Sequence, residues 1–389
     1  MENRRKVKME HTEGTKKAGA SKAEFAGWYM LSRVRNELFG IAILGIFVFH
    51  IAQSILDTKV KAGRKYTFAW IYDLLVSSTG VELFVILSGV GLCFSFHKDG
   101  RIVEFYKRRL FRIVIPYLLF AFPFWIYVDV IIKKLKFSHA LKDLFFITLV
   151  RDGKRTLWYI FFIIGMYIIY PLLFNIFSYR TGREKSRKER RRLMVIATVM
   201  IVLCYVIVYV IKKKTPNLYN HTEIALLRVP EFIYGAWLGE KVYRKKMISV
   251  PDIILPVVGM ILKMILVMDR ADKKIDIERV FHGRLVAFLY GVALLLIFAM
   301  IFDLLRESGR LVILRKVISE IGKTSLELYL SHIMVRHVIL LKFGAKGFVK
   351  RVFIYTVLSF ALAFMMRFLY SFLRAKTGTL FLKRKRSNK

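Results

Sequence analysis

Polar side chains that could do chemistry are rare in this sequence, and His50 is placed best for acid–base work. It directly follows the apolar run 41–49. An imidazole titrates near neutral pH and can act as a general base. A histidine at a membrane interface that hydrogen-bonds a neighbouring carbonyl group would give the same pattern. Both interpretations of His50 therefore stay open.

The next apolar segment begins with an acid and continues with small residues. Glu82 stands at its start, and Ser88, Gly89 and Gly91 follow. Small residues let membrane helices pack closely. The carboxylate of Glu82 could orient or charge-stabilise the imidazole of His50, or it could simply complement the positive N-terminal end of its own helix.

Arginines mark the start of the third apolar segment. Arg109 and Arg112 are three residues apart and therefore share a helix face. Guanidinium groups suit phosphate, so we expect a phosphorylated ligand from the cytosol to bind here. Alternatively, these basic residues only fix the orientation of the chain in the membrane. That alternative explains Lys107 and Arg108 better than Arg112, which lies inside the apolar run.

Two later segments carry aromatic and hydroxyl groups. Trp158 and Tyr159 open one of them, where an aromatic belt at the membrane interface also explains them. Ser325, Tyr329 and His332 fall at i, i+4 and i+7, so they share one stripe of a helix. Because polar groups are costly against lipid, this stripe should face the protein interior. It would form either a structural network or the wall of an active site.

The short motifs of common soluble enzymes are absent from the sequence. It has no GxSxG elbow, P-loop, HExxH motif or dinucleotide fingerprint. Its two cysteines, Cys93 and Cys204, lie in apolar runs without metal-ligand spacing, so we expect no metal site.

The composition predicts an all-α integral membrane protein. Hydrophobic residues make up 56% of the 389 residues, and the mean hydropathy is +0.46. A soluble protein cannot bury that much apolar surface, and disordered, collagen and disulfide-scaffold classes are excluded as well. The net charge of +39 sits in short clusters between apolar runs. This pattern indicates membrane topology and contact with anionic lipids, not nucleic acid.

A membrane-spanning helix needs about 20 mostly apolar residues. By this measure we expect a bundle of about ten transmembrane helices. The segment 224–240 is the weakest of them. Residues 140–150 are too short to span and should be half-buried or lie at the membrane interface. The ten predicted segments are 36–56, 78–97, 109–132, 156–178, 191–212, 224–240, 250–268, 284–304, 321–342 and 348–373.

Basic residues predict the orientation of these segments. With the N-terminus inside, the cytoplasmic segments carry 38 Lys and Arg and the outer loops 22, so both termini are expected in the cytoplasm. We expect a basic segment over 1–32, a membrane domain over 33–374 and a basic tail over 375–389. No cleavable signal peptide and no attached soluble domain are expected.

These features, taken in order, resemble the acyltransferase-3 family of integral membrane acyltransferases. The first apolar segment ends in a histidine, as in the family. The resemblance covers residues 33–374. The other matching segments are GVELFVILSG (80–89), FYKRRLFRIVIPY (105–117), LWYI followed by Tyr170-Pro171, and GKTSLELYLSH (322–332), which resembles a late Gly-x-x-Ser…Tyr-Leu-x-His signature.

The resemblance implies a multi-pass enzyme of the cell membrane. Such an enzyme moves an acyl group, commonly acetyl from acetyl-CoA, onto a hydroxyl of a glycan or lipid-linked glycan of the cell envelope. By this resemblance His50 is catalytic, Glu82 is the acid of the second span, and Arg109 and Arg112 bind the acyl-CoA donor. Acyl-CoA is a substrate here, and no bound cofactor is expected. The expected partners are this donor, the glycan acceptor and membrane lipids; further substrate-binding residues would be Trp158, Tyr159, Ser325, Tyr329 and His332.

One position departs from the family pattern. The family usually has Arg or Lys eleven positions before the first-span histidine, where this chain has Phe39. Arg35 lies one turn earlier on roughly the same face and could substitute, reaching the site from about 6 Å farther toward the cytoplasm. The alternatives to an O-acetyltransferase are a transporter or flippase of a lipid-linked glycan, and a family relative without catalytic activity.

Overall fold

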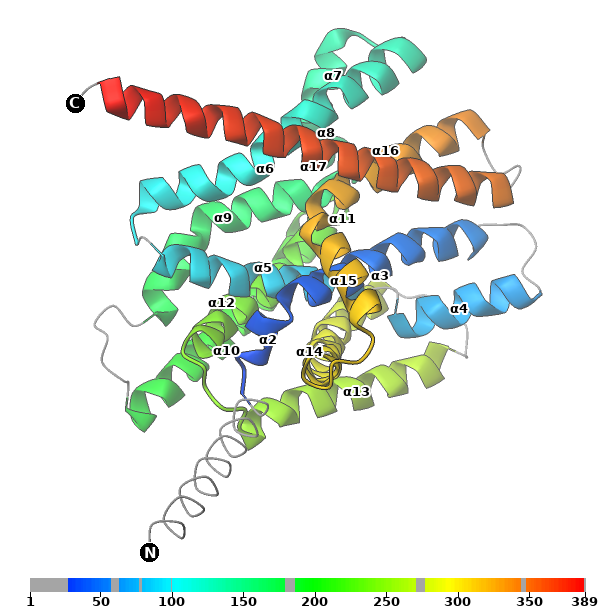
Figure 1. The fold of residues 1–389 in the computed structure, drawn as a ribbon. Helices are drawn as coiled ribbons and strands as arrows, with labels where there is room; N and C mark the ends of the chain where they lie inside the picture. Colours follow the sequence, from blue (N-terminus) through cyan, green and yellow to red (C-terminus); the bar gives the residue numbers. More distant parts are fainter. Residues whose placement is uncertain are drawn as a thin grey trace, which may run out of the picture.

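The chain folds into a bundle of α-helices (Figure 1). The computed structural model describes residues 27–56, 63–76, 79–98, 100–178, 186–270, 277–343 and 348–387. Within these ranges the regular elements are helices, without a strand. The predicted all-α membrane class is confirmed.

The first half of the chain contains the helices that carry most of the predicted site residues. They are α2 (Met30–Arg33), α3 (Arg35–Leu56), α4 (Arg64–Val76), α5 (Thr79–His97), α6 (Ile102–Trp125) with its π-helical continuation η1 (Ile126–Ile132), α7 (Phe137–Leu144), α8 (Ile147–Asp152) and α9 (Trp158–Phe177).

The second half of the chain surrounds these helices and adds the polar stripe of α16. Its helices are α10 (Arg187–Lys214), α11 (Pro216–Leu226), α12 (Val229–Tyr243), α13 (Val250–Arg270), α14 (Ile277–Glu307), α15 (Val312–Lys323), α16 (Ser325–Phe343) and α17 (Phe348–Ser387).

Eight helices in the described ranges are long and apolar enough to cross a membrane. They correspond to eight of the ten predicted segments. The segment predicted over 224–240 is divided between α11 and α12, because Pro230 in the first turn of α12 cannot continue a preceding helix. The segment predicted over 321–342 is divided at Thr324, between α15 and α16. The count of ten spans and the cytoplasmic side of the termini stay predictions.

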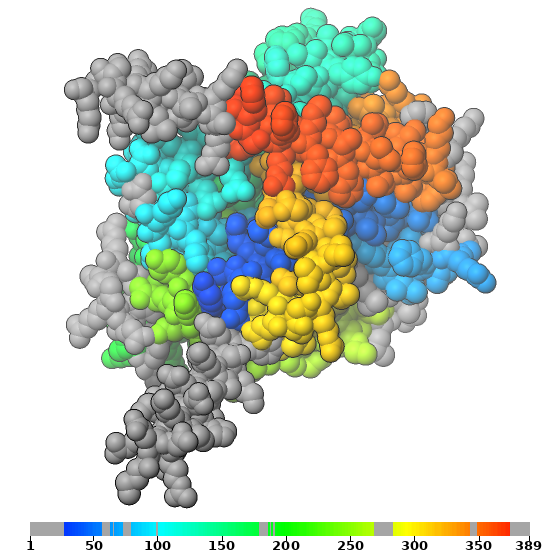
Figure 2. All heavy atoms as spheres, viewed as in Figure 1, coloured from blue at the N-terminus to red at the C-terminus, as the bar shows by residue number. Residues whose placement is uncertain are grey.

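Helix α5 lies at the centre of the bundle, and α10 and α13 lie at its edge. In α5, 83% of the most apolar stretch is buried, against 11% in α10 and in α13. The edge helices expose large apolar side chains such as Val199, Val206 and Met264. Lipid can cover such side chains, whereas water cannot do so without cost. On the face drawn in Figure 2, α15 and α17 cover much of the bundle.

Small residues bring α5 and α12 into close contact, as the sequence predicted for the Ser88–Gly91 region. A Cβ atom on Gly89 would lie 2.7 Å from the backbone nitrogen of Ala236. A larger residue at position 89 would therefore push α12 away from the central helix. Gly91 leaves space for a side chain and not for a helix backbone, because a Cβ atom there would lie 3.0 Å from the guanidinium of Arg35.

Helix α3 gives the bundle two recognisable ends. It begins with Arg35 and carries His50 near its other end. At about 1.5 Å per residue, the Cα atoms of these two residues are about 22 Å apart along the helix axis. We refer to the Arg35 end and the His50 end of the bundle. The topology prediction places the Arg35 end at the cytoplasmic side.

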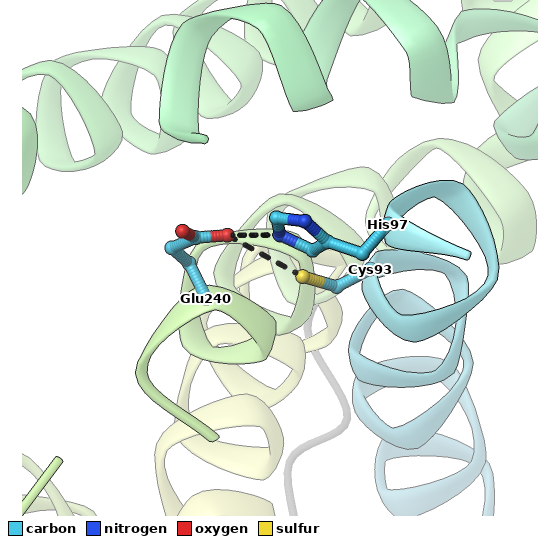
Figure 3. Close-up of side chains that lie close together, drawn as sticks. All are labelled: Cys93, His97 and Glu240. Carbon is cyan, nitrogen blue, oxygen red and sulfur yellow. Dashed lines mark hydrogen bonds and ion pairs between the residues drawn. The ribbon is translucent and has the colours of Figure 1, made fainter. Parts of the chain in front are cut away.

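At the Arg35 end, a polar cluster joins α5 to α12 (Figure 3). The Nε2 of His97 donates to Oε2 of Glu240 at 2.9 Å, and the thiol of Cys93 donates to the same oxygen at 3.6 Å. Arg244 donates to the other carboxylate oxygen at 2.7 Å. A thiol, an imidazole and a carboxylate at this spacing could hold a metal ion. Because Arg244 already balances the carboxylate, we interpret the cluster as a joint between two helices.

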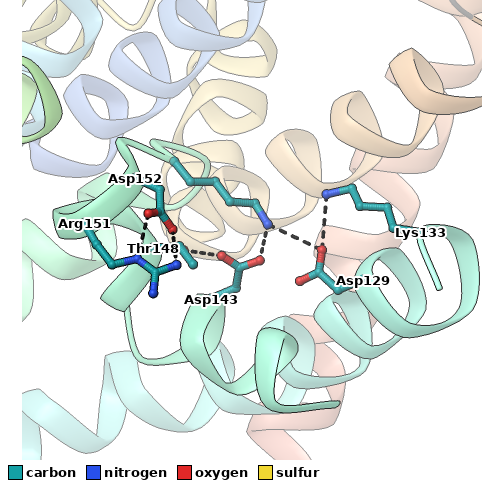
Figure 4. A network of polar contacts seen from close by, with 7 residues as sticks. Asp129, Lys133, Asp143, Thr148, Arg151 and Asp152 are labelled. Atoms are coloured by element: carbon teal, nitrogen blue, oxygen red, sulfur yellow. Dashed lines mark hydrogen bonds and ion pairs between the residues drawn. The ribbon is translucent and has the colours of Figure 1, made fainter. Parts of the chain in front are cut away.

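At the His50 end, ion pairs hold the short helices α7 and α8 against η1 (Figure 4). Lys133 lies 3.2 Å and Lys154 lies 3.4 Å from the Asp129 carboxylate. Lys154 also donates to Asp143, as does the hydroxyl of Thr148. Burial and the neighbouring Asp129 carboxyl raise the pKa of Asp143, whereas these two donors lower it. The apolar segment 140–150 therefore forms a half-buried cap, as predicted.

Candidate active site

Most of the predicted substrate-binding residues line one cavity at the Arg35 end. The cavity has a volume of about 150 Å³ and draws its walls from α3, α5, α6, α9, α15 and α16. We call it the arginine cavity. It is lined by Arg35, Asn36, Phe39, Phe84, Ser88, Gly91, Arg109, Arg112, Ile113, Tyr159, Ile163, Tyr167, Gly322, Lys323, Ser325 and Leu326.

Arg35 and Phe39 meet inside this cavity. The guanidinium carbon of Arg35 lies 5.0 Å from the ring centroid of Phe39, a cation–π distance. Phe39 in turn makes an edge-to-face contact with Phe84, with centroids 5.0 Å apart. The Nε of Arg35 is buried and has no hydrogen-bond partner among the described residues. Arg35 and Phe39 line the same cavity. Arg35 thus places its positive charge where a basic residue at position 39 would also place one.

The two arginines of α6 reach the same cavity. Arg109 donates to the carbonyl oxygen of Gly91 at 2.9 Å, which fixes its guanidinium against α5. Arg112 lines the cavity one helical turn later, as the i, i+3 spacing predicts, and is exposed. Lys323 adds a fourth basic group. Such a cluster attracts phosphate and can bind it with several charge-assisted hydrogen bonds.

A line of packed side chains, which begins with one polar contact and continues through ring contacts, leads from this cavity to His50; we call it the polar line because each of its members carries a polar group. The hydroxyls of Ser88 and Tyr159 lie 3.3 Å apart. The ring of Tyr159 lies 5.1 Å from that of Tyr329, and the ring of Tyr329 lies 5.6 Å from that of His332. His332 ends the line against His50, 5.4 Å away between ring centroids. The stripe predicted on α16 does face the interior, because Ser325, Tyr329 and His332 are all buried.

Hydrogen bonds to Gln53 define the proton positions on His50. Arg336 donates to Oε1 of Gln53 at 2.9 Å. Because a guanidinium can only donate, this atom of Gln53 must be the amide oxygen. The same oxygen lies 3.3 Å from Nδ1 of His50, so Nδ1 must carry the hydrogen. In the neutral ring, Nε2 then keeps its lone pair and is the basic nitrogen.

His332 has the same tautomer for a similar reason. Its Nδ1 lies 2.7 Å from the carbonyl oxygen of Leu328, which can only accept. Its Nε2 therefore carries a lone pair when the ring is neutral. This nitrogen is buried and has no hydrogen-bond partner among the described residues. Two imidazoles with defined tautomers thus lie side by side at the end of the polar line.

Comparison with known protein families agrees with this arrangement. The sequence model of an acyltransferase domain, that of the acyltransferase-3 family, matches residues 40–368. The chain belongs to the acyltransferase-3 family. No curated protein and no solved structure matches the chain significantly. The matched part of this membrane acyltransferase includes His50 and the arginines of α6, whereas Arg35 and Phe39 precede it.

Glu82 of the acyltransferase contacts other groups than His50. It is fully buried, and Arg228 donates to its Oε1 at 3.5 Å. The guanidinium of Arg228 lies 4.8 Å from the ring centroid of Trp158. Glu231 is also fully buried nearby on α12, and neither of its carboxylate oxygens has a hydrogen-bond partner in the described part of the chain. Glu82 thus pairs with the charge of Arg228, and Trp158 makes a cation–π contact with the same guanidinium. The participation of Glu82 in catalysis and of Trp158 in substrate binding stays a prediction.

Sequence reasoning about the acyltransferase missed Gln53 and Arg336. The signal was present, because Gln53 follows His50 by three residues and Arg336 follows His332 by four. Both spacings put the two members of each pair on one helix face. Only the packing of α3 against α16 shows that the two pairs meet. The pairing of Arg228 with Glu82, 146 positions earlier in the chain, could not be predicted from spacing at all.

Proposed function

We propose that the protein is a membrane O-acyltransferase of the cell membrane that transfers acetyl, or another acyl group, from acyl-CoA to a hydroxyl of a cell-surface or exported polysaccharide. Membership of the family supports acyl transfer in general. One observation carries the more specific proposal. A cavity with three arginines is joined by a line of packed polar and aromatic side chains to a histidine whose basic nitrogen is defined.

The arginine cavity is the proposed donor site. Arg35, Arg109 and Arg112 would bind the phosphates of acyl-CoA, because guanidinium groups match phosphate oxygens in charge and geometry. A cavity of about 150 Å³ holds only a small part of such a molecule, so most of the nucleotide would lie outside it. About 22 Å separates Arg35 from His50 along α3. The extended pantetheine arm would therefore follow the polar line toward His50.

His50 is the proposed general base. Its Nε2 would take the proton from the acceptor hydroxyl, and the resulting alkoxide oxygen would attack the thioester carbonyl carbon. Collapse of the tetrahedral intermediate forms the ester and breaks the carbon–sulfur bond. The departing CoA thiolate then takes the proton back from His50, which restores the enzyme. The Tyr329 hydroxyl, which is buried and has no partner among the described residues, could stabilise the oxyanion.

Thioester consumption by purified protein in liposomes tests this function. We expect acetyl-CoA to be consumed when a polysaccharide acceptor is present, and labelled acetyl to appear in an alkali-labile ester. The variant His50→Ala should consume it about 10²–10⁴ times more slowly. Export or flipping of a glycan without thioester consumption would support the transporter alternative. Donor binding without turnover would support a relative that has lost catalysis.

A further inference from the structure

His50 opens onto a second, smaller pocket at its own end of the bundle. This pocket has a volume of about 30 Å³, and we call it the His50 pocket. Its walls come from α3, α16 and α17, so three separate parts of the chain build it. His50 is half-buried and lines the pocket, whereas His332 is fully buried. A group that enters from this end of the bundle therefore meets His50 first.

A buried hydroxyl group lies in the lining of the same pocket. It belongs to Tyr355, whose ring stacks on Phe47 with centroids 4.4 Å apart and planes at 16°. This stacking fixes the ring. The hydroxyl has no hydrogen-bond partner among the residues that the structure describes. Buried hydroxyls nearly always have a partner, so this one indicates a group that binds from outside.

His50 and Tyr355 together complement an alcohol. The Nδ1 hydrogen of His50 is held by Gln53, so Nε2 offers a lone pair. The hydroxyl of Tyr355 can donate its hydrogen. An alcohol can donate to the first group and accept from the second at the same time. The other hydroxyl in the lining, that of Ser54, already donates to the backbone oxygen of His50 at 2.8 Å.

The size of the pocket limits which alcohol can enter. About 30 Å³ accommodates roughly two water molecules, and therefore about two non-hydrogen atoms. A hydroxymethyl group has this size, and its carbon can pack on the apolar side chains of Ile51, Ile339 and Val352 in the walls. A hydroxyl on a ring carbon reaches the same depth only if part of the ring enters as well. The pocket is too small for that.

We propose that the His50 pocket receives a primary alcohol group of the acceptor, and that Tyr355 holds its oxygen next to His50. The acceptor is then a glycan or polyol polymer with free hydroxymethyl groups, which is acylated on these groups and not on ring hydroxyls. This inference rests on the proposed function, because it assigns the position at which that reaction acts.

The reaction at this position is balanced. The proton of the primary hydroxyl goes to Nε2 of His50, and the alcohol oxygen forms its new bond to the carbonyl carbon of the thioester. The carbon–sulfur bond then breaks, and the departing thiolate of CoA takes the proton from His50. The products are a primary ester and free CoA.

The position of the ester in the polymer that the cells make tests this assignment. Cells that produce the protein would be compared with cells that lack it, by NMR of the isolated polymer that separates methylene from methine carbons. We expect protein-dependent esters on methylene carbons. Protein-dependent esters on ring methine carbons would overturn this inference and leave the proposed function standing. Absence of any protein-dependent ester would refute the proposed function, and this inference with it.

A wider pocket should relax the selection. Val352 is half-buried in the wall of the pocket, and Val352→Ala makes more room there. Val349 lies one turn earlier on α17, is exposed and does not line the pocket, so Val349→Ala is the matched control. We expect Val352→Ala to add esters on ring carbons, and Val349→Ala to give the pattern of the unchanged protein. If Val352→Ala is active and its ester pattern is unchanged, the size of the pocket does not select the hydroxyl.

Tyr355→Phe tests the hydroxyl and keeps the ring that stacks on Phe47. The acceptor in this assay is the polymer from cells that lack the protein. We expect KM for the polymer to rise about three- to tenfold, the value of one hydrogen bond, with the affinity for acetyl-CoA and the melting temperature unchanged. Tyr370→Phe, on the same helix outside the pocket, is the control and should leave KM unchanged. An unchanged KM in Tyr355→Phe would refute the contact between Tyr355 and the acceptor.

Discussion

His50 on α3 and His332 on α16 face each other across the bundle, with ring centroids 5.4 Å apart. Each ring has its Nδ1 hydrogen held by an oxygen, of Gln53 in one case and of Leu328 in the other. Each therefore directs a lone pair, not a hydrogen, from Nε2. Two such bases at one site can have different roles. One can take the proton of the acceptor, and the other can pack against the first and hold it in place.

Loss of either histidine should have a different consequence. We expect His50→Ala to lower the transfer rate by about 10²–10⁴, the usual value of general-base catalysis, with little change in melting temperature. His332→Ala removes a fully buried ring and should lower the stability by about 2–5 kcal/mol. Initial rates and thermal unfolding of both variants decide this. Equal losses of stability would mean that His50 too is structural.

Gln53 should act through His50. Gln53→Leu removes the acceptor that holds the Nδ1 hydrogen, so His50 can adopt the wrong tautomer. We expect kcat to fall about three- to tenfold, the value of one hydrogen bond, and KM for acetyl-CoA to stay unchanged. Gln53→Glu keeps an oxygen acceptor for both His50 and Arg336 and should retain most of the activity. If Gln53→Leu leaves kcat unchanged, catalysis does not depend on the contact between Gln53 and His50.

Donor binding should depend on charge inside the arginine cavity and not on charge nearby. Arg112→Gln should weaken acetyl-CoA binding about tenfold or more, because one charge-assisted contact to phosphate is lost. Lys107→Gln removes the same charge from an exposed position of the same helix that does not line the cavity, and should have little effect. Arg35→Gln should behave like Arg112→Gln. Calorimetric titration measures the affinity of each variant for acetyl-CoA. If all three variants bind it as tightly as the unchanged protein, the arginines only fix the membrane topology.

A double-mutant cycle tells whether Glu82 is structural or catalytic. Glu82→Gln leaves Arg228 as a buried charge with one partner fewer, and we expect a loss of about 3–5 kcal/mol in stability. Arg228→Met in the same chain should recover much of this loss. Activity should return together with stability if Glu82 only balances Arg228. Stability that returns without activity would assign the carboxylate a direct part in the reaction.

Helix α10 offers a test of the topology. Its 28 residues span about 42 Å, enough to cross a membrane. In a chain with Cys93 and Cys204 replaced, single cysteines at the exposed positions Lys188 and Asn217 should react with a membrane-impermeant reagent from opposite sides. We expect the residue at 188 to be protected in intact cells. Labelling of both positions from outside would contradict the ten-span prediction.

Apolar run length and charge clusters were sufficient to predict the membrane class and eight of the spans. They were insufficient at 224–240 and 321–342, where helix breaks fall inside apolar sequence. Pro230 gave a signal for the first break. At the second, Thr324 accepts a hydrogen bond at 2.6 Å from Arg367 of α17, a contact that no local pattern contains.

Periodicity predicted which side chains of the site share a helix face, but not which faces meet. It grouped Arg109 with Arg112, and Tyr329 with His332. The structure places both arginines in the lining of one cavity and buries Tyr329 and His332 in the interior. The expected approach of Glu82 to His50 rested on a similar depth in the membrane. Depth says nothing about direction around a helix axis, and the structure places Glu82 against Arg228 instead.

The rings of Tyr159 and Tyr329, 5.1 Å apart, stand on the line of contacts between the arginine cavity and His50. Packed rings exclude water, and small ions cross a bilayer only where water or polar groups replace their hydration. Under the proposed function, these two side chains also limit the leakage of ions through the bundle when no pantetheine arm lies between them. An enzyme with a wider passage could turn over faster, but ions would leak through it. This leakage would dissipate the membrane potential of its own cell.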